Sequence, residues 1–190
     1  MYMKQESQQH LLNLSRQTLE YYFRTSNKLE IDKSEVGEEL KDSRGTFVTL
    51  TKNGELRGCI GHNEAIQPIY LDVIDNTLSA AFEDNRFESL QESELKDLHI
   101  EISVLTKPKK LNYSSAEDLL NQLRPLVDGV IIEKGIASAT YLPQVWEGWS
   151  GDSIKVEFLS SLCQKAGLSQ NEWKTGDLEV YTYQAEVFHE

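Results

Sequence analysis

The sequence has few of the residues and motifs that support the commonest functional assignments. It contains only two cysteines, Cys59 and Cys163, far apart and outside any C-x-x-C motif. Two cysteines are too few for a disulfide framework, so we expect a reducing, cytoplasmic setting. The histidines show no close spacing of the H-E-x-x-H kind, which argues against a structural zinc site. They are His10, His62, His99 and His189.

Long apolar runs and phosphate-binding motifs are also missing. No stretch approaches the roughly 20 consecutive apolar residues of a membrane span, and the polar residues 1–9 lead into no apolar run, so neither insertion nor export is predicted. The sequence has no G-x-x-x-x-G-K-[ST], no G-x-G-x-x-G and no G-x-S-x-G. Interpretations as a phosphate-loop protein, a dinucleotide-binding protein or a serine hydrolase therefore lack their motifs.

Basic residues are in short supply. The chain has 31 acidic and 19 basic residues, for a formal net charge of −12. This charge repels phosphate backbones, so nucleic acid is not an expected partner. With 190 residues, 39% of them hydrophobic, the chain can bury a real core as one domain (1–190) or as two small interlocked lobes.

Residues 45–61 give the strongest local prediction, a β-hairpin. Two β-prone runs flank Asn53-Gly54, the pair best suited to the positive φ angles of a type I′ turn. Across a two-residue loop Arg57 and Cys59 would share one face of the hairpin. The expected cross-strand pairs are Lys52 with Glu55, Leu50 with Arg57, Thr49 with Gly58 and Val48 with Cys59.

The remaining patterns predict an α+β fold. Apolar spacing predicts helices over 8–24, 66–82, 115–123 and 153–166, and strands over 98–106, 129–132, 136–141 and 178–188. The charge-rich residues 27–44 are expected to form a solvated loop. Strands interrupted irregularly by helices favour a mainly antiparallel sheet with flanking helices over a doubly wound parallel sheet.

The segment around Cys59 is the first candidate for chemistry. Gly58 and Gly61 interrupt a strand pattern, which indicates a bulge or a close approach by another segment or a ligand. The forked, permanently charged side chain of Arg57 suits a carboxylate or phosphate, of the substrate or of the protein itself. If that pair is structural, Glu101 or Asp84 is the expected partner.

Two hypotheses fit Cys59. It is either a nucleophile, with its thiolate favoured by Arg57 and by His62 or His99 and with Glu101 as base, or a small buried apolar residue. Cys163 lies on a predicted helix and is expected only to pack. His99 and Glu101 could ligate a metal together with His62, but such spacing is common by chance, so no metal is predicted.

Two other segments carry polar groups suited to binding. Arg86 follows a predicted helix, where it is either free to reach an acidic group or simply a solvated residue at the helix exit. Residues 139–146 concentrate hydroxyl, amide and indole groups; Thr140, Tyr141 and Gln144 would suit a cleft wall for a small polar ligand. Alternatively, Tyr141 and Trp146 fill a core.

From Gly45 onward the chain resembles the AMMECR family, named after a human chromosomal region linked to Alport syndrome, midface hypoplasia and elliptocytosis. The hallmark Leu56-Arg57-Gly58-Cys59-Ile60-Gly61 is intact, and further motifs follow in the family's order. These are Ala80-Ala81-Phe82, Arg86-Phe87, residues 100–105 and residues 140–145.

The resemblance implies a fold of two lobes on either side of a cleft lined by the hallmark. The larger lobe would take approximately residues 1–65 and 115–190, and the smaller lobe residues 66–114. Many prokaryotic members are similar to protein A of the AmmeMemoRadiSam system, encoded beside a Memo-type and a radical-SAM protein. The family has no settled activity, so the resemblance names neither substrate nor cofactor.

Two functional hypotheses follow. In the first the protein is an enzyme that acts on a small anionic metabolite, with Arg57 or Arg86 orienting it, Cys59 as nucleophile and Glu101 as base. In the second it is a non-catalytic binding module for a Memo-type or radical-SAM protein. A strand-end cysteine beside an arginine and two glycines favours the enzyme, because packing alone does not require that set.

Overall fold

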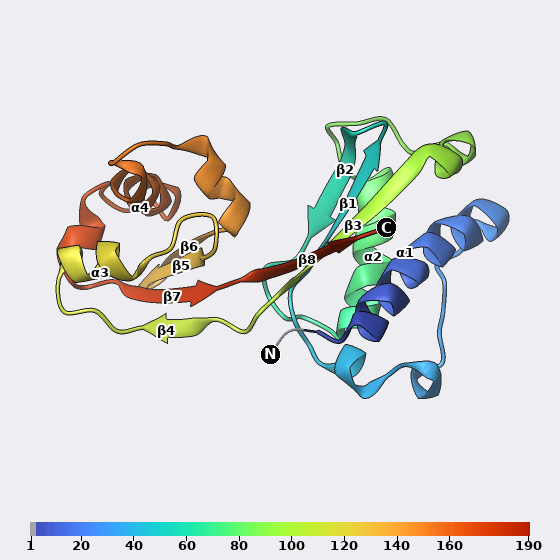
Figure 1. Cartoon of the computed structure of the whole chain (residues 1–190), viewed down its shortest axis with the longest axis horizontal. Helices are drawn as coiled ribbons and strands as arrows, with labels where there is room; N and C mark the ends of the chain where they lie inside the picture. The colour runs from blue at the N-terminus through green and yellow to red at the C-terminus, as the bar shows by residue number, and fades with distance from the viewer. Residues whose placement is uncertain (1–2) are drawn as a thin grey trace. The chain divides into compact units, whose positions relative to one another are not determined.

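The computed structural model describes residues 3–190 and divides into two compact units (Figure 1). The first unit takes the chain up to Leu105 and adds Glu186–Glu190, and the second is Thr106–Ala185. The chain therefore passes between the units twice, and the first unit is discontinuous in sequence.

The first unit contains a four-stranded sheet in the order β2-β1-β3-β8. Its strands are β1 (Thr46–Lys52), β2 (Glu55–Gly61), β3 (Leu98–Leu105) and β8 (Ala185–His189). The predicted hairpin joins β1 to β2, and its turn residues Asn53 and Gly54 have φ angles of 53° and 82°. A type I′ turn requires positive φ at both positions, so the Asn-Gly pair explains the turn.

Two helices, α1 (Gln5–Thr25) and α2 (Ile69–Phe82), form one hydrophobic core with this sheet. Val48 and Leu50 of β1 and Ile100 and Ile102 of β3 have no exposed surface. These four alternate with less buried neighbours, as expected of strands with one face covered. Burying each such side chain contributes about 1.5–3 kcal/mol. The other face of β1 and β3 carries Thr49 and its cross-strand partner Glu101.

The second unit has its own sheet and its own core. The sheet order is β4-β7-β5-β6, with β4 (Lys109–Leu111), β5 (Gly129–Lys134), β6 (Ala137–Tyr141) and β7 (Glu179–Tyr183), and its α-helices are α3 (Ala116–Gln122) and α4 (Ile154–Lys165). Trp146 is fully buried: its ring stacks on Phe158 with centroids 3.5 Å apart, and its indole N–H donates to the carbonyl of Asp128 at 2.6 Å. Trp146 therefore fills a core.

Short 3-10 helices occupy several connections. They are η1 (Lys33–Glu35), η2 (Glu38–Lys41), η3 (Glu92–Asp97), η4 (Pro143–Gly148) and η5 (Glu172–Lys174). The first two interrupt the predicted loop over 27–44. Among residues 3–190, no helix combines the length and apolar character needed to cross a membrane.

The α+β class with antiparallel sheets is confirmed, with one correction of detail. Residues 178–188 form two strands instead of one: β7 belongs to the second unit, β8 pairs in the first sheet, and Gln184 separates them. Because α2 packs on β1 and β2, residues 66–82 lie in the same compact unit as the hairpin.

Candidate functional site

A β-bulge in β2 determines which side chains meet around the hallmark segment. Thr51 pairs with Leu56, but Leu50 pairs with Gly58, so Arg57 is an extra residue without a partner in the ladder. The predicted pairing of Leu50 with Arg57 is wrong, as is every pair beyond it. A bulge adds one residue to one strand, and an ideal two-residue hairpin has no such step.

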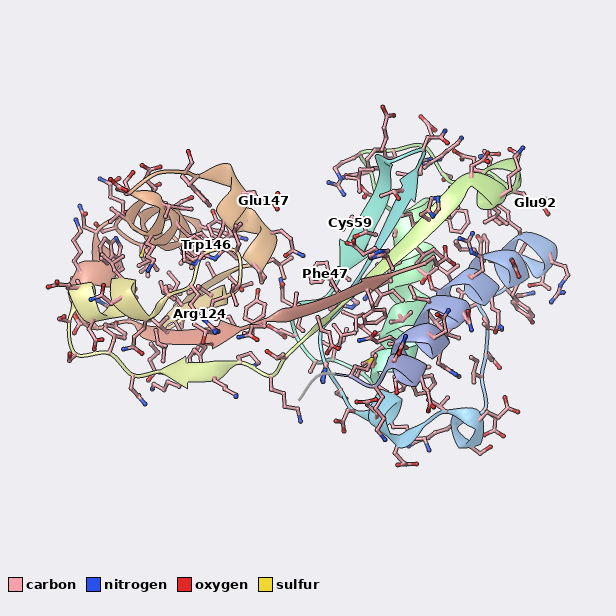
Figure 2. All side chains as sticks on the ribbon, viewed as in Figure 1. Phe47, Cys59, Glu92, Arg124, Trp146 and Glu147 are labelled. Atoms are coloured by element: carbon pink, nitrogen blue, oxygen red, sulfur yellow. The ribbon has the colours of Figure 1, made fainter. Side chains whose placement is uncertain are left out.

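The two glycines of the hallmark are explained by close packing within the first unit. A Cβ on Gly58 would overlap the carbonyl oxygen of Ala80 at the end of α2, and a Cβ on Gly61 would overlap the carbonyl of Thr46 and the ring of Phe47. Figure 2 shows Phe47 on β1 and Cys59 on the adjacent β2. A segment of the protein itself, instead of a ligand, therefore requires glycine at both positions.

Cys59, Thr49 and Glu101 lie in one row across three strands. Cys59 pairs with Thr49, and Thr49 pairs with Glu101 on its other side. Because Thr49 lies between the buried Val48 and Leu50, the row is on the face opposite to them. The Thr49 hydroxyl donates to the Cys59 sulfur at 3.3 Å. Two strand spacings place the main chains of Cys59 and Glu101 on the order of 10 Å apart.

The two cysteines have different environments. Cys59 is half-buried, whereas Cys163 is fully buried on α4 in the core of the second unit. Burial raises the pKa of the Cys163 thiol, because an apolar surrounding disfavours the thiolate. Cys163 is therefore a packing residue, as predicted.

The main chain of Cys59 is held at both of its polar groups by Asp84 and Arg86. Its N–H donates to Asp84 Oδ2 at 2.9 Å, and its carbonyl accepts from Arg86 Nη2 at 3.3 Å. Arg86 also donates two hydrogen bonds to the Asp84 carboxylate, from Nε at 2.9 Å and from Nη2 at 2.7 Å. Because β2 is an edge strand, these bonds occupy backbone groups that the ladder leaves unpaired.

The charges of this pair stabilise one another. The hydrogen bond from Arg86 holds the pKa of Asp84 far below its ordinary range, against the opposing effect of burial. The hydrogen bond to Asp84 raises the pKa of Arg86; burial opposes this, and negative charge on Asp84 and on Cys59 adds to it. The ion pair therefore keeps both Asp84 and Arg86 in their charged forms.

Arg57 pairs with Glu94 of η3, not with Glu101 or Asp84 as expected. Its Nε and Nη2 donate to the two oxygens of Glu94 at 3.2 and 3.0 Å, and its Nη1 donates to the carbonyl of Glu88 at 2.7 Å. Lys52 donates to the same carboxylate at 2.8 Å. The hydrogen bond from Arg57 is the main reason why the pKa of Glu94 falls to about 2.

His62 is engaged away from Cys59. Its Nδ1 lies 2.7 Å from Oδ1 of the buried Asp72, on α2. Since α2 packs on the face opposite to Cys59, His62 is not a partner of the thiol. His99 is on the other side of the sheet from this pair: it is exposed and pairs with Thr51 on the Cys59 face. Among residues 3–190 the structure contains no group of three or more His, Cys, Asp or Glu that could hold a metal ion.

Two candidate residues of the second unit, Thr140 and Tyr141, make contacts inside that unit. The Thr140 hydroxyl is 2.9 Å from the Tyr183 hydroxyl, and the Tyr141 hydroxyl is 3.0 Å from that of Ser161. The Tyr141 ring also packs against Phe158 in the core. Gln144 is exposed on η4. The hydroxyls of Thr140 and Tyr141 thus have internal partners.

The sequence interpretation missed two residues of the site. Glu94 had a signal, because Gln91 and Glu94 form a capping box that starts η3 just before β3. Thr49 had none, because its contact with Cys59 depends on the bulge. The structure brings together Cys59, Thr49, Asp84, Arg86 and Glu101.

Fold and site together define an α+β protein with a partly accessible cysteine on an edge hairpin, held by an aspartate–arginine pair. The AMMECR1 family model matches residues 12–188, and the chain belongs to this family. A protein of Methanothermobacter thermautotrophicus is 39% identical over 180 residues, which cover 95% of this chain and 92% of that protein. Protein MK0488 of Methanopyrus kandleri is 37% identical over 190 residues, covering 97% and 89%.

A solved structure has the same fold. The crystal structure of the uncharacterized protein PH0010 from Pyrococcus horikoshii matches with a TM-score of 0.80 and 35% sequence identity, covering 99% of this chain and 93% of that chain.

Proposed function

We propose that the protein is an enzyme that acts on a small anionic metabolite, with Cys59 as its nucleophile. The observation that carries this proposal is the way Cys59 is held. The residue is half-buried, its sulfur accepts a hydrogen bond from Thr49, and its N–H and carbonyl are fixed by Asp84 and Arg86. Nucleophilic catalysis requires a thiol that is rigidly placed and not sealed in a core, and a half-buried, anchored Cys59 fits this requirement.

The proposed step is a displacement at an electrophilic carbon of the substrate. The thiol proton passes to a base, for which Glu101 is the candidate, and a sulfur lone pair forms the new bond to carbon. The displaced group leaves with its bonding electron pair. Because Glu101 lies on the strand beyond Thr49, the proton would travel through a water molecule or the Thr49 hydroxyl.

The predicted cleft is part of the same proposal. Residues 56–61 of the first unit would line it.

The first experiment measures alkylation of Cys59 by iodoacetamide, in a Cys163→Ala background and followed by peptide mass spectrometry. We expect Cys59 to react faster than glutathione at pH 7, and Cys59→Ser to abolish turnover in a subsequent metabolite screen while leaving the free energy of unfolding nearly unchanged. A Cys59 that reacts more slowly than glutathione in the folded protein would exclude the nucleophile.

A binding module is the second candidate, and a specific observation favours it. Leu56 on β2 and Val187 on β8 are 43% and 45% exposed, so both edge strands present large apolar side chains. Exposed apolar groups at sheet edges suit a protein partner. We propose a Memo-type or radical-SAM protein as that partner. Capture of the purified partner that survives Cys59→Ser and is lost in Leu56→Asp would support this function over catalysis.

A further inference from the structure

Two arginines lie beside Cys59, and the structure distinguishes them. Arg57 uses all three of its side-chain nitrogens within the protein: two on Glu94 and one on the carbonyl of Glu88. Its side chain is only 16% exposed. Arg57 therefore has no guanidinium nitrogen left without a protein acceptor.

Arg86 keeps one nitrogen available. A guanidinium has five N–H donors. The Nε donor and the two Nη2 donors of Arg86 account for its bonds to Asp84 and to the carbonyl of Cys59. Its Nη1 makes no hydrogen bond with the described residues 3–190, and the side chain is 53% exposed.

The free nitrogen has a fixed direction. Two bonds from one guanidinium to one carboxylate fix the plane of the fork, and Asp84 is itself anchored, with a side chain only 3% exposed. The guanidinium also lies 5.4 Å from the centre of the Phe87 ring. An exposed arginine that is oriented before ligand binds loses less conformational entropy on binding.

We propose that Arg86 binds the anionic group of the substrate through Nη1 and that Asp84 is its positioning residue. This rests on the proposed role of Cys59. Nη2 of the same guanidinium hydrogen-bonds to the Cys59 carbonyl, so an anion on Nη1 would lie next to the residue that carries the proposed nucleophile. The substrate class is thus a small electrophile with a carboxylate or phosphate close to the carbon that sulfur attacks.

The test compares two electrophiles of nearly equal size, iodoacetate and iodoacetamide, which differ in charge. In both reactions sulfur bonds to the CH₂ carbon, iodide leaves with the bonding pair, and the thiol proton goes to solvent. The measured quantity is the rate of alkylation of Cys59 by iodoacetate divided by its rate with iodoacetamide. This ratio is then divided by the same ratio for glutathione. The protein is the full chain with Cys163→Ala.

We expect this normalised ratio to exceed one, although a net charge of −12 disfavours an anionic reagent. Arg86→Gln should lower it by roughly five- to tenfold, the effect of losing one charge-assisted hydrogen bond. Arg24→Gln is the matched control: it removes the same charge from the last turn of α1 and should leave the ratio unchanged.

Further variants separate positioning from charge. Asp84→Asn keeps the size of the side chain and an oxygen for the Cys59 N–H, but loses the carboxylate that orients Arg86. It should lower the ratio while the iodoacetamide rate stays within about twofold. Arg86→Lys keeps the charge without the fork and should give an intermediate ratio. If Arg86→Gln does not fold, Arg86→Lys still tests the proposal, because an unchanged ratio in that variant would overturn it.

The outcomes separate this inference from the proposed function. Fast iodoacetamide alkylation with a normalised ratio near one would leave Cys59 as a nucleophile and refute the anion site. Slow alkylation by both reagents would refute the nucleophile and, with it, the inference.

Discussion

Around Cys59, each acidic side chain that anchors an arginine is matched to that arginine by two hydrogen bonds. Asp84 holds Arg86 and Glu94 holds Arg57, in both cases through two guanidinium nitrogens. The two pairs differ in the guanidinium nitrogens that have acceptors among residues 3–190: all three nitrogens of Arg57 have one, whereas Nη1 of Arg86 has none. Residues of the same type on neighbouring segments therefore differ in the donors that their protein contacts leave available.

Replacing Glu94 by Gln tests the structural pair. The change removes the carboxylate that Arg57 and Lys52 share, and a partly buried charged hydrogen-bond network of this kind contributes on the order of 1–3 kcal/mol. We expect the free energy of unfolding in urea to fall by about that amount. Glu92→Gln, an exposed change in the same 3-10 helix, is the control and should have almost no effect.

The same pair predicts a pH dependence. The folded-state pKa of Glu94 is about 2, against an ordinary value of 4.5. A depressed folded pKa adds stability above the unfolded value, and this stability is lost as the pH falls through the folded value. The stability difference between wild type and Glu94→Gln should be full above pH 4.5 and shrink toward pH 2. Urea unfolding at several pH values measures it; a constant difference would contradict the assignment.

Thr49 tests the hydrogen bond to sulfur. Thr49→Val keeps the shape and the strand preference of the side chain but removes the hydroxyl that donates to Cys59. We expect iodoacetamide alkylation of Cys59 to slow by roughly two- to fivefold, because the thiolate loses a donor. Thr51→Val, two residues along the same face and opposite Leu56, is the matched control. Equal effects of the two changes would assign the result to packing.

At the scale of the elements, the edge strand β2 is held close to α2 by the lack of a side chain at Gly58. A Cβ at this position overlaps the carbonyl of Ala80. We expect Gly58→Ala to lower the free energy of unfolding by about 1–3 kcal/mol, the usual cost of overpacking. Gly37→Ala has open space around it and a φ of −59°, so thermal unfolding of that variant should match wild type.

Most of the elements could be predicted from the sequence, because local patterns determine them. The Asn53-Gly54 turn, the alternation of residues 98–104 and the helical spacing of α1, α2 and α4 are all confirmed. Ser115, the first residue of the predicted helix 115–123, caps α3 by accepting from the N–H of Asp118. Each of these depends on interactions within a few residues.

What the sequence could not predict depends on contacts between distant segments. The bulge at Arg57 accompanies the packing of β2 on α2, and the pairing of Arg57 with Glu94 crosses 37 residues. Residues 178–188 have one continuous alternating pattern, but β7 and β8 pair in two different sheets. The pattern alone therefore does not predict the break between the two strands. The hallmark segment stays the candidate site predicted from the sequence, but the partners of its residues depend on the strand register and could not be predicted.

At the scale of the whole molecule, the two units have separate hydrophobic cores. The first includes Leu50 and Ile100, and the second includes Trp146 and Leu162. All three tryptophans of the chain lie in the second unit, so tryptophan fluorescence reports on that unit alone.

Leu50→Ala tests whether the cores unfold separately. Removing a fully buried leucine costs about 2–5 kcal/mol. We expect the urea transition seen by Cys59 labelling to move to lower denaturant, and the tryptophan fluorescence transition to stay in place. Leu162→Ala should do the reverse. Equal movement of both transitions in either variant would show that the two units unfold as one.

The position of β8 in the chain has a consequence for biosynthesis. The first unit needs this strand, since Glu186 accepts hydrogen bonds from the N–H of Met3 and from Gln8 at the start of α1. On the ribosome, β8 emerges only after all of Thr106–Ala185. The nascent chain must therefore carry an uncovered edge of β3 while the second unit, continuous in sequence, is free to fold first. The sheet that contains Cys59 is therefore completed only after residues 106–185 have been synthesised.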